Sequence, residues 1–268
     1  MIDASESVIR LSIFIGVFML MTALEFFLPR VKAKATCKNR WFDNLSLMLL
    51  SAFFVRLLLP LSATVVAAYV EGHHIGLLQV ISMPYWLQVV LAVLILDMVI
   101  YTQHRLFHQV SFLWRFHKVH HTDKEVDVTT AVRFHPLEIF ISTLIKIVAI
   151  VILGAPALAV LLFEIILSSM ALFNHSNVYL AKGLDKWLRF IVVTPDMHRI
   201  HHSIIVRETN SNYGFSLSIW DRLFASYTLK PSKKYTHMQL GLKNYNKIDL
   251  NLTALFLLPL RVRGNKIK

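Results

Sequence analysis

Apolar stretches long enough to cross a bilayer constrain the fold of this chain most. Three of them occupy residues 8–28, 44–70 and 85–103, and a fourth, residues 140–173, is too long for one ordinary span. A hydrocarbon core of about 30 Å takes about 20 residues of helix. A Gly-Ala-Pro break at residues 154–156 predicts that the fourth stretch is a tight helical hairpin. We therefore predict an all-α membrane bundle of about four to five helices, hairpin included, in a single domain.

The composition fits a membrane protein. The chain has 268 residues, of which 56% are apolar and 16% charged, and one cysteine. Disordered chains are polar and rich in charge, and disulfide scaffolds need paired cysteines, so both classes are excluded. The formal charge is +12. In an apolar chain such an excess marks cytoplasmic membrane flanks, so nucleic acid is not an expected partner. No secretory signal peptide is expected, because the segment before the first apolar stretch is acidic.

The positive charges predict the orientation. The loop between the first two spans carries Arg30, Lys32, Lys34, Lys38 and Arg40, whereas residues 71–84 contain almost no Lys or Arg. Cytoplasmic loops are enriched in these residues. We therefore expect a multi-pass integral membrane protein with its active site and C-terminus in the cytoplasm, in the inner membrane of a bacterium or the endoplasmic reticulum of a eukaryote. Residues 104–135 and 174–227 would form a cytoplasmic cap, followed by a basic tail, residues 228–268.

Two amphipathic segments and one charged pair accompany the spans. Residues 182–190 and 250–260 are each predicted to be an interfacial anchor or a helix packed on the cap. Lys146 and Glu164 lie about equally far on either side of Ala155. A hairpin folded at that alanine would bring them to similar depth, and intramembrane charges usually pair. We therefore predict a Lys146–Glu164 ion pair.

Histidines gather in three short clusters after the third span. They are HRLFH with His104 and His108, HKVHH with His117, His120 and His121, and HRIHH with His198, His201 and His202. Residues i, i+3 and i+4 lie on one face of a helix, so each cluster offers its imidazoles to one side. Imidazole suits zinc, iron, copper and nickel. Because one ion takes four to six ligands, the number of histidines indicates two ions.

Other residues near these clusters fit the same site or lie outside it. His73, His74 and His237 are isolated or on the other side of the membrane, and we expect them to be ordinary polar residues. Arg105 follows His104, so the HExxH pattern of zinc proteases is absent. Asp97 lies seven residues before His104, on the same helical stripe. It is expected either to orient a ligating imidazole or to act as a capping or water-bonded acid.

The order HxxxH, HxxHH, membrane hairpin and HxxHH resembles the fatty acid hydroxylase / sterol desaturase superfamily of membrane di-iron oxygenases. The resemblance covers about residues 97–227. It includes the flanking segments Leu-Trp-Arg-Phe at 113–116, Arg-Phe-His-Pro-Leu-Glu at 133–138, Asn-His-Ser-Asn at 174–177, Asn-Tyr-Gly at 212–214 and Trp-Asp-Arg-Leu-Phe at 220–224. The chain departs from the family at Ala225-Ser226, where Gly-Thr is commoner.

The resemblance implies a function, a cofactor and further ligands. Two irons held by the eight clustered histidines would use O2 to oxidise a C–H bond of a membrane lipid: a fatty acyl group, a sterol, an ether lipid or a head group. His175 and His135 are implied as additional ligands. The chain lacks a dinucleotide fingerprint, a haem attachment motif and a cysteine cluster, so electrons would come from a cytoplasmic electron-transfer protein. The basic surface favours an acidic carrier.

Three other functions compete with lipid hydroxylation. A lipid desaturase would use the same di-iron site and differ only in its product. A histidine-rich metal transporter would need polar residues repeated across several spans, and this chain has few. A membrane cytochrome would need histidines deep within its spans, whereas these histidines flank them.

Overall fold

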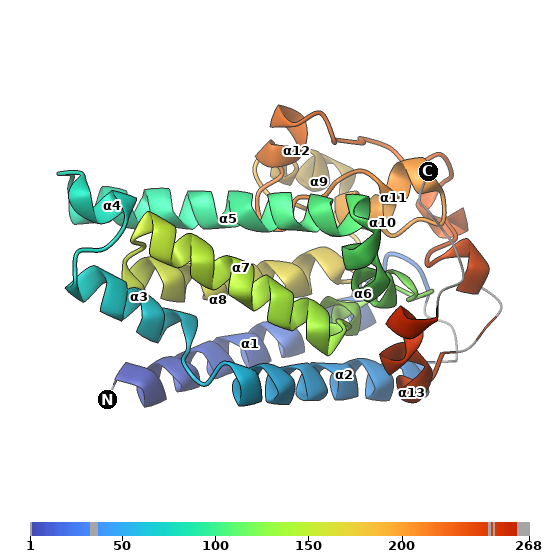
Figure 1. Ribbon diagram of the computed structural model, residues 1–268. Helices are drawn as coiled ribbons and strands as arrows, with labels where there is room; N and C mark the ends of the chain where they lie inside the picture. Colours follow the sequence, from blue (N-terminus) through green and yellow to red (C-terminus); the bar gives the residue numbers. More distant parts are fainter. Residues whose placement is uncertain (1, 33–36, 246–247, 249, 262–268) are drawn as a thin grey trace.

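The protein is a bundle of long helices with a cap of short helices at one end (Figure 1). The computed structural model describes residues 2–32, 37–245, 248 and 250–261. Five segments of this part of the chain are long and apolar enough to cross a membrane. They overlap α1 (Ile2–Phe27), α2 (Cys37–Leu58), α5 (Tyr85–Gln109), α7 (Pro136–Leu153) and α8 (Ala157–His175). No strand occurs among the described residues, so the predicted all-α bundle is confirmed.

The second predicted span, residues 44–70, is two helices rather than one. Helix α2 ends at Leu58, and α3 (Ala63–Gly72) begins after Ser62, whose side chain accepts a hydrogen bond from Val65 N. Pro60 lies between them. Proline lacks an N–H and excludes the helical conformation from the residue before it, so the helix cannot continue. The short α4 (Leu77–Val80) then leads into α5.

The hairpin turns where the sequence predicted, although its helices extend beyond residues 140–173. Gly154 ends α7 in the left-handed conformation, with a φ of 66°. A Cβ at this position would lie 2.4 Å from Ile75 O, so both the backbone angle and the space require glycine. Helix α7 packs on α2, α3 and α5, and α8 packs on α1, α3 and α5. The two arms of the hairpin thus share α3 and α5, and differ in that α7 contacts α2 whereas α8 contacts α1.

A charged network joins the arms of the hairpin to α1. Lys146 Nζ contacts Glu164 Oε1, which is the pairing expected from their equal distances from the turn. Arg10 adds a contact that the sequence did not predict, at 2.6 Å from the second carboxylate oxygen of Glu164. Arg10 also contacts Glu6 at 3.3 Å. Two acids and two bases therefore offset one another, with the carboxylates buried and Arg10 partly exposed, as expected of intramembrane charges.

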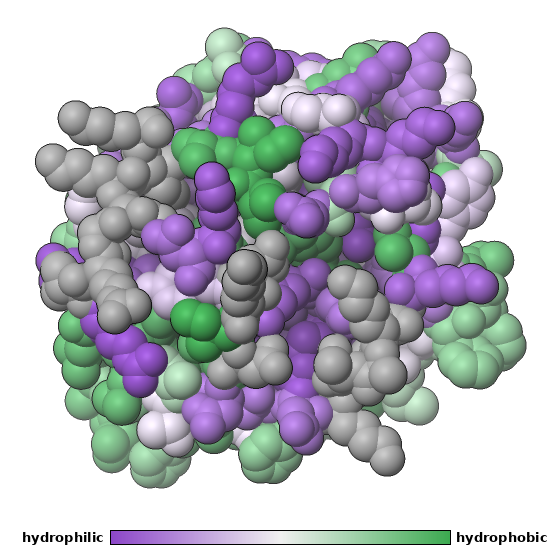
Figure 2. Space-filling view, turned by 90° about the vertical axis from the view of Figure 1, so that its right-hand side faces the viewer, coloured by the Kyte–Doolittle hydropathy of each residue, from purple (hydrophilic) through white to green (hydrophobic). Residues whose placement is uncertain are grey.

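The cap follows α5 and covers one end of the bundle. Its helices are α6 (Ser111–His121), η1 (Val128–Val132), α9 (Lys182–Leu188), α10 (Pro195–His201), α11 (Val206–Thr209), α12 (Ile219–Leu223), η2 (Tyr235–His237), η3 (Lys243–Tyr245), α13 (Leu252–Phe256) and η4 (Leu258–Leu260). The end of α1 and the start of α2, which flank the basic loop, lie at this same end (Figure 1). The outer face of the cap is rich in hydrophilic side chains (Figure 2).

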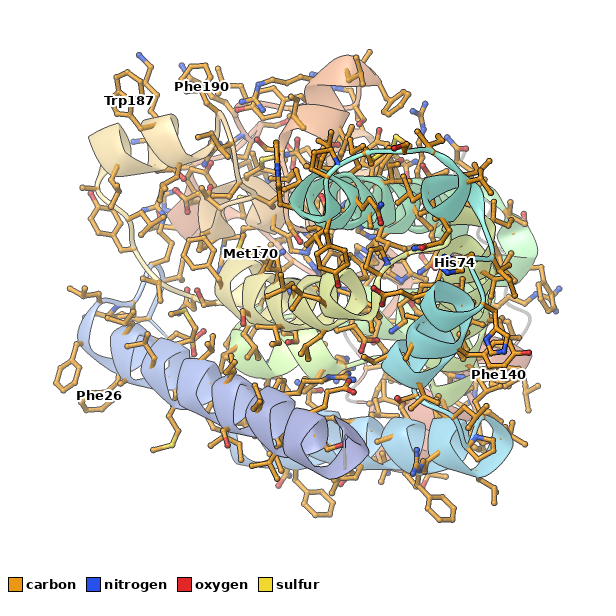
Figure 3. All side chains as sticks on the ribbon, turned by 90° about the vertical axis from the view of Figure 1, so that its left-hand side faces the viewer. Phe26, His74, Phe140, Met170, Trp187 and Phe190 are labelled. Atoms are coloured by element: carbon orange, nitrogen blue, oxygen red, sulfur yellow. The ribbon has the colours of Figure 1, made fainter. Side chains whose placement is uncertain are left out.

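The two amphipathic segments behave differently. Trp187 of α9 is 75% exposed and, with Phe190, points away from the bundle (Figure 3). In contrast, Leu255 and Leu258 are fully buried in a cluster with residues of α2 and α6. The C-terminal segment is therefore a helix packed on the cap, and the anchor prediction survives only for α9. The tail charges Arg263, Lys266 and Lys268 lie outside the described residues.

Candidate metal centre

Nine histidines converge in the interior of the cap as two adjacent groups. The first group is His104, His108, His117, His121 and His201, and the second is His120, His175, His198 and His202. Within each group the ligating nitrogens all lie within 4.8 Å of one another. Every one of these side chains is buried, with at most 6% of its surface exposed. The structure thus brings together all eight clustered histidines and His175.

The two HxxHH segments divide their histidines between the groups in a reciprocal way. Helix α6 gives His117 and His121 to the first group and His120 to the second. The α10 segment gives His198 and His202 to the second group and His201 to the first. Residues i and i+4 are nearly aligned along a helix, whereas i+3 projects to one side. Each segment therefore supplies ligands to both groups, not to one.

The spacing of the ring nitrogens suits metal coordination. His104 Nε2 and His117 Nε2 are 3.1 Å apart, and His175 Nε2 lies 3.0 Å from both His120 Nε2 and His198 Nε2. A divalent ion holds imidazole nitrogens at about 2.0–2.1 Å, which places neighbouring ligand nitrogens about 3 Å apart. The short contacts therefore match two sets of ligands that each surround an ion.

Hydrogen bonds made by Nδ1 of three histidines leave their Nε2 atoms unprotonated and able to bind a metal ion. His104 Nδ1 donates to Tyr213 O and His201 Nδ1 donates to Ser211 O, each at 2.8 Å, and His175 Nδ1 donates to Ala171 O. A carbonyl oxygen only accepts, so these Nδ1 atoms carry the protons. The Nε2 atoms are left with lone pairs that point into the groups. The residues present therefore fit a pair of metal ions.

Burial keeps these imidazoles neutral. It lowers the pKa of His117 to about 3. Burial, together with neighbouring imidazoles, also lowers the pKa of five other cap histidines well below its ordinary value: His120, His121, His198, His201 and His202. Neutral imidazole is the form that binds metal. The site is thus ready for cations at neutral pH.

Glu138 is a residue of this site to which the sequence assigned no role. Its Oε1 accepts a hydrogen bond of 2.6 Å from His117 Nδ1, and both side chains are buried. A carboxylate on the outer nitrogen fixes the tautomer of a ligating histidine and raises its basicity. A signal was present in the sequence, because Glu138 and Lys146 are the only charged residues of an otherwise apolar α7.

Asp97 does not contact a histidine, which corrects the expectation that it orients one. Asp97 Oδ2 accepts hydrogen bonds from Trp220 Nε1 at 2.8 Å and from Leu217 N at 3.2 Å. Asp221 holds the same loop, accepting from Tyr213 N at 2.8 Å. The same loop supplies the carbonyl of Tyr213, which accepts the hydrogen bond from His104.

His135 is the predicted ligand that the structure does not bring to either group. Its Nδ1 accepts a hydrogen bond from Leu137 N, capping α7, and its Nε2 pairs with Phe256 O at 3.1 Å. Both ring nitrogens of His135 therefore have other hydrogen-bond partners. Its position directly before a proline at the start of a helix is one that a capping residue occupies. His73, His74 and His237 are exposed and outside both groups, as expected.

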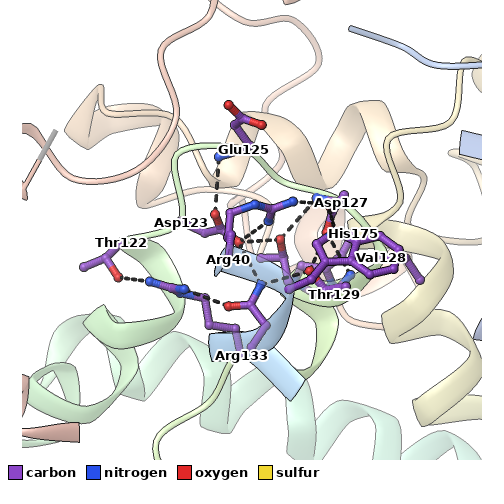
Figure 4. Close-up of polar contacts among 12 residues, drawn as sticks. Arg40, Thr122, Asp123, Glu125, Asp127, Val128, Thr129, Arg133 and His175 are labelled. Carbon is purple, nitrogen blue, oxygen red and sulfur yellow. Dashed lines mark hydrogen bonds and ion pairs between the residues drawn. The ribbon is translucent and has the colours of Figure 1, made fainter. Parts of the chain in front are cut away.

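A buried ionic network fixes the end of α6 against α2 (Figure 4). Arg40 of α2 contacts Asp127 and lies 2.8 Å from Asp123, two residues beyond the second histidine cluster. Arg133 donates to Thr122 Oγ1 at 2.9 Å and to Asn44. These bonds hold the C-terminal turn of α6 in place, and with it the two histidines at its end.

A cavity of about 460 Å³ extends from the first histidine group into the bundle. His104, His117 and Glu138 line its inner end. Lys146 and Glu164 line it two turns further along α7 and α8, and the walls between are mostly apolar. A chain of lipid dimensions can thus reach the histidines from inside the bundle.

The chain is similar to lipid-oxidising enzymes. A family model described as fatty acid hydroxylase matches residues 89–226. Ornithine lipid hydroxylase OlsE of Rhizobium tropici is 34% identical over 187 residues, which cover 68% of this chain and 53% of that protein. Alkylglycerol monooxygenase of Homo sapiens is 26% identical over 157 residues, or 58% of this chain and 34% of that protein. Fatty acid hydroxylase vlmA of a Lecanicillium species is 32% identical, over 53% of this chain and 42% of that protein.

The chain thus spans about half the length of these relatives or less. The search of solved structures found no match.

Proposed function

The chain belongs to the fatty acid hydroxylase family, and we propose that it is an O2-dependent hydroxylase of a membrane lipid with two irons in its histidine groups. The observation that carries this proposal is the pair of adjacent, buried, all-histidine groups with a cavity leading to one of them. Redox-active iron suits imidazole ligands, and two close irons supply oxidising power for an unactivated C–H bond. Five and four ligands match the coordination numbers of two such ions.

The residues of the chain divide the remaining tasks. His104 and His117, at the inner end of the cavity, would place the first ion where a substrate carbon arrives. The hydrogen bond from His117 Nδ1 to Glu138 would orient the His117 imidazole so that its Nε2 atom faces the first ion. The apolar walls exclude water, which protects the oxidising site from side reactions. The substrate is thereby expected to be an alkyl segment rather than a soluble polar molecule.

The electrons are proposed to come from a cytoplasmic redox protein. The cap carries exposed cationic side chains, which favour an acidic carrier: Lys182, Lys186, Arg207, Lys230, Lys233 and Lys234. Desaturation at the same site is the alternative, and the product distinguishes it. Metal transport has less support, because the relatives named above are hydroxylases or monooxygenases.

Anaerobic purification with metal analysis, followed by lipidomics, tests this function. About two irons per chain are expected in the unmodified protein. A hydroxylated lipid should disappear in cells that carry His120→Ala or His201→Ala, each of which removes a ligand from a different group. One tightly held zinc and an unchanged lipid profile would overturn the proposal. An alkene in place of the alcohol would assign the protein to the desaturases.

The cytoplasmic orientation of the cap is also a proposal. Arg30, in the basic loop between α1 and α2, contacts Asp196 of the cap at 2.7 Å, and the distribution of positive charge is expected to place this end of the bundle in the cytoplasm. A reporter fused after Lys268 should be active only in the cytoplasm. A reporter that is active outside the cytoplasm would overturn the proposed orientation but would not bear on the metal site.

A further inference from the structure

Helices α1 and α2 leave a window in the side of the bundle. Helix α1 packs on α8 and α2 packs on α7, so these two helices have different partners. At the cap end the window is closed by Phe18 and Trp41, whose ring centroids are 6.2 Å apart. At the other end Thr64 Oγ1 donates a hydrogen bond of 2.5 Å to Glu6. Between these two contacts, α1 and α2 border the cavity.

The cavity reaches the surface of the protein at this window. Its lining includes Arg10 and Phe14 of α1 and Met48 and Ala52 of α2. All four are at least partly exposed. The opening is therefore on the side of the bundle rather than in the cap.

Apolar, exposed side chains surround the opening. Leu11 and Ile15 flank it on α1, and Leu49 and Phe53 flank it on α2, with Phe53 67% exposed. Both helices belong to segments that are long and apolar enough to cross a bilayer. On helices long enough to cross a bilayer, a mouth bordered in this way is expected to face hydrocarbon.

The interior suits an alkyl chain. The cavity has a volume of about 460 Å³. A water molecule or a methylene group takes up about 30 Å³, so about fifteen such groups fit in it. Arg10 and Lys146 are both paired with Glu164, so the charges at the end of the cavity remote from the histidines are already compensated. A further charged group would find no unpaired partner there, whereas a saturated chain needs none.

We propose that one alkyl or acyl chain of a bilayer lipid enters sideways between α1 and α2 and fills this cavity up to His104 and His117. The proposal deepens the proposed function by naming the route and the occupant. Only the oxidation of the bound chain rests on the proposed hydroxylase function. The entry itself depends on the window and on the apolar lining.

Labelling of a single cysteine inside the cavity tests the entry route. Ser168 lines the cavity, and Ser168→Cys in a Cys37→Ser background provides one thiol in the chain. The full-length protein is reconstituted in phosphatidylcholine vesicles and treated with dodecyl maleimide or with a sulfonated, water-soluble maleimide. We expect dodecyl maleimide to react at least tenfold faster. Equal or faster reaction of the sulfonated reagent would overturn the proposal.

A tryptophan at the window provides the matched test. Ala52→Trp places an indole at the mouth, whereas Phe53→Trp puts the same indole in place of an exposed phenyl ring at the neighbouring position. We expect Ala52→Trp to slow labelling by dodecyl maleimide at least tenfold and Phe53→Trp to leave it within twofold. Unchanged labelling in Ala52→Trp would refute entry at this window. Labelling requires neither metal nor O2, so its outcome is independent of whether the hydroxylase assignment is correct.

Discussion

Replacing Glu138 by glutamine tests how the first histidine group holds its ion. Glu138 Oε1 lies 2.6 Å from His117 Nδ1, and both side chains are buried. A hydrogen bond to a charged group contributes about 1.5–3 kcal/mol, and a neutral one about 0.5–1.5 kcal/mol. Glutamine keeps an acceptor oxygen but loses the charge, so the change costs about 1.3 kcal/mol, the difference between the middles of these two ranges. That difference is about tenfold in affinity for the first ion, at the lower end of the 10–100-fold typical of such partners.

Chelator competition on the iron-loaded protein measures this effect. We expect Glu138→Gln to release one iron about tenfold faster than the unmodified protein, and to release the other at the unmodified rate, because His117 belongs to the first group alone. The matched control is Glu71→Gln, which keeps an acceptor for Ala157 N at the far end of the bundle. Equal release of both irons, or release as slow as in the control, would refute the local role of the carboxylate.

Other substitutions separate the two groups and the elements that support them. His201→Ala and His202→Ala should each leave about one iron per chain, measured by elemental analysis, but with different spectroscopic signatures, since each removes a ligand from a different group. Asp97→Asn should lower the melting temperature through a loss of about 1–3 kcal/mol while both irons are retained, because this acid holds a loop rather than a ligand. Lys146→Met should destabilise the protein, measured by unfolding in detergent, by less than the about 3–5 kcal/mol typical of a fully broken buried pair, because Arg10 still contacts Glu164. Removing Arg10 as well, by Arg10→Met in the same chain, should bring the larger loss.

The sequence predicted the site better than the details of its support. The three clusters were expected at the metal centre because their spacing places the histidines on one face of a helix. His175 was expected there only because the family resemblance implied it. The allocation of His120 and His201 to opposite groups could not be predicted, because it depends on how α6 and α10 face each other. For Asp97 the sequence left two roles open, and neither of them included the loop 120 residues later to which it is hydrogen-bonded.

Single residues also decided where the spans differ from expectation. Pro60 divides the second apolar stretch, and hydropathy alone does not register a proline that breaks a helix. His135 follows the general rule for helix starts rather than the rule for metal ligands, since its ring caps α7. In both cases a requirement of the local backbone, a helix break at Pro60 and a helix cap at His135, decided the structure against a pattern drawn from many residues.

The reciprocal division of the histidine segments has a consequence for the order of assembly during synthesis. Four of the five ligands of the first group come from residues 104–121, so this group can capture an ion once α5 and α6 have formed. The second group has only His120 and His175 until α10 has been made. Loading is therefore expected to be sequential. The second ion would bind only after the chain has been synthesised to residue 202, and it would then link α6, α8 and the α10 segment.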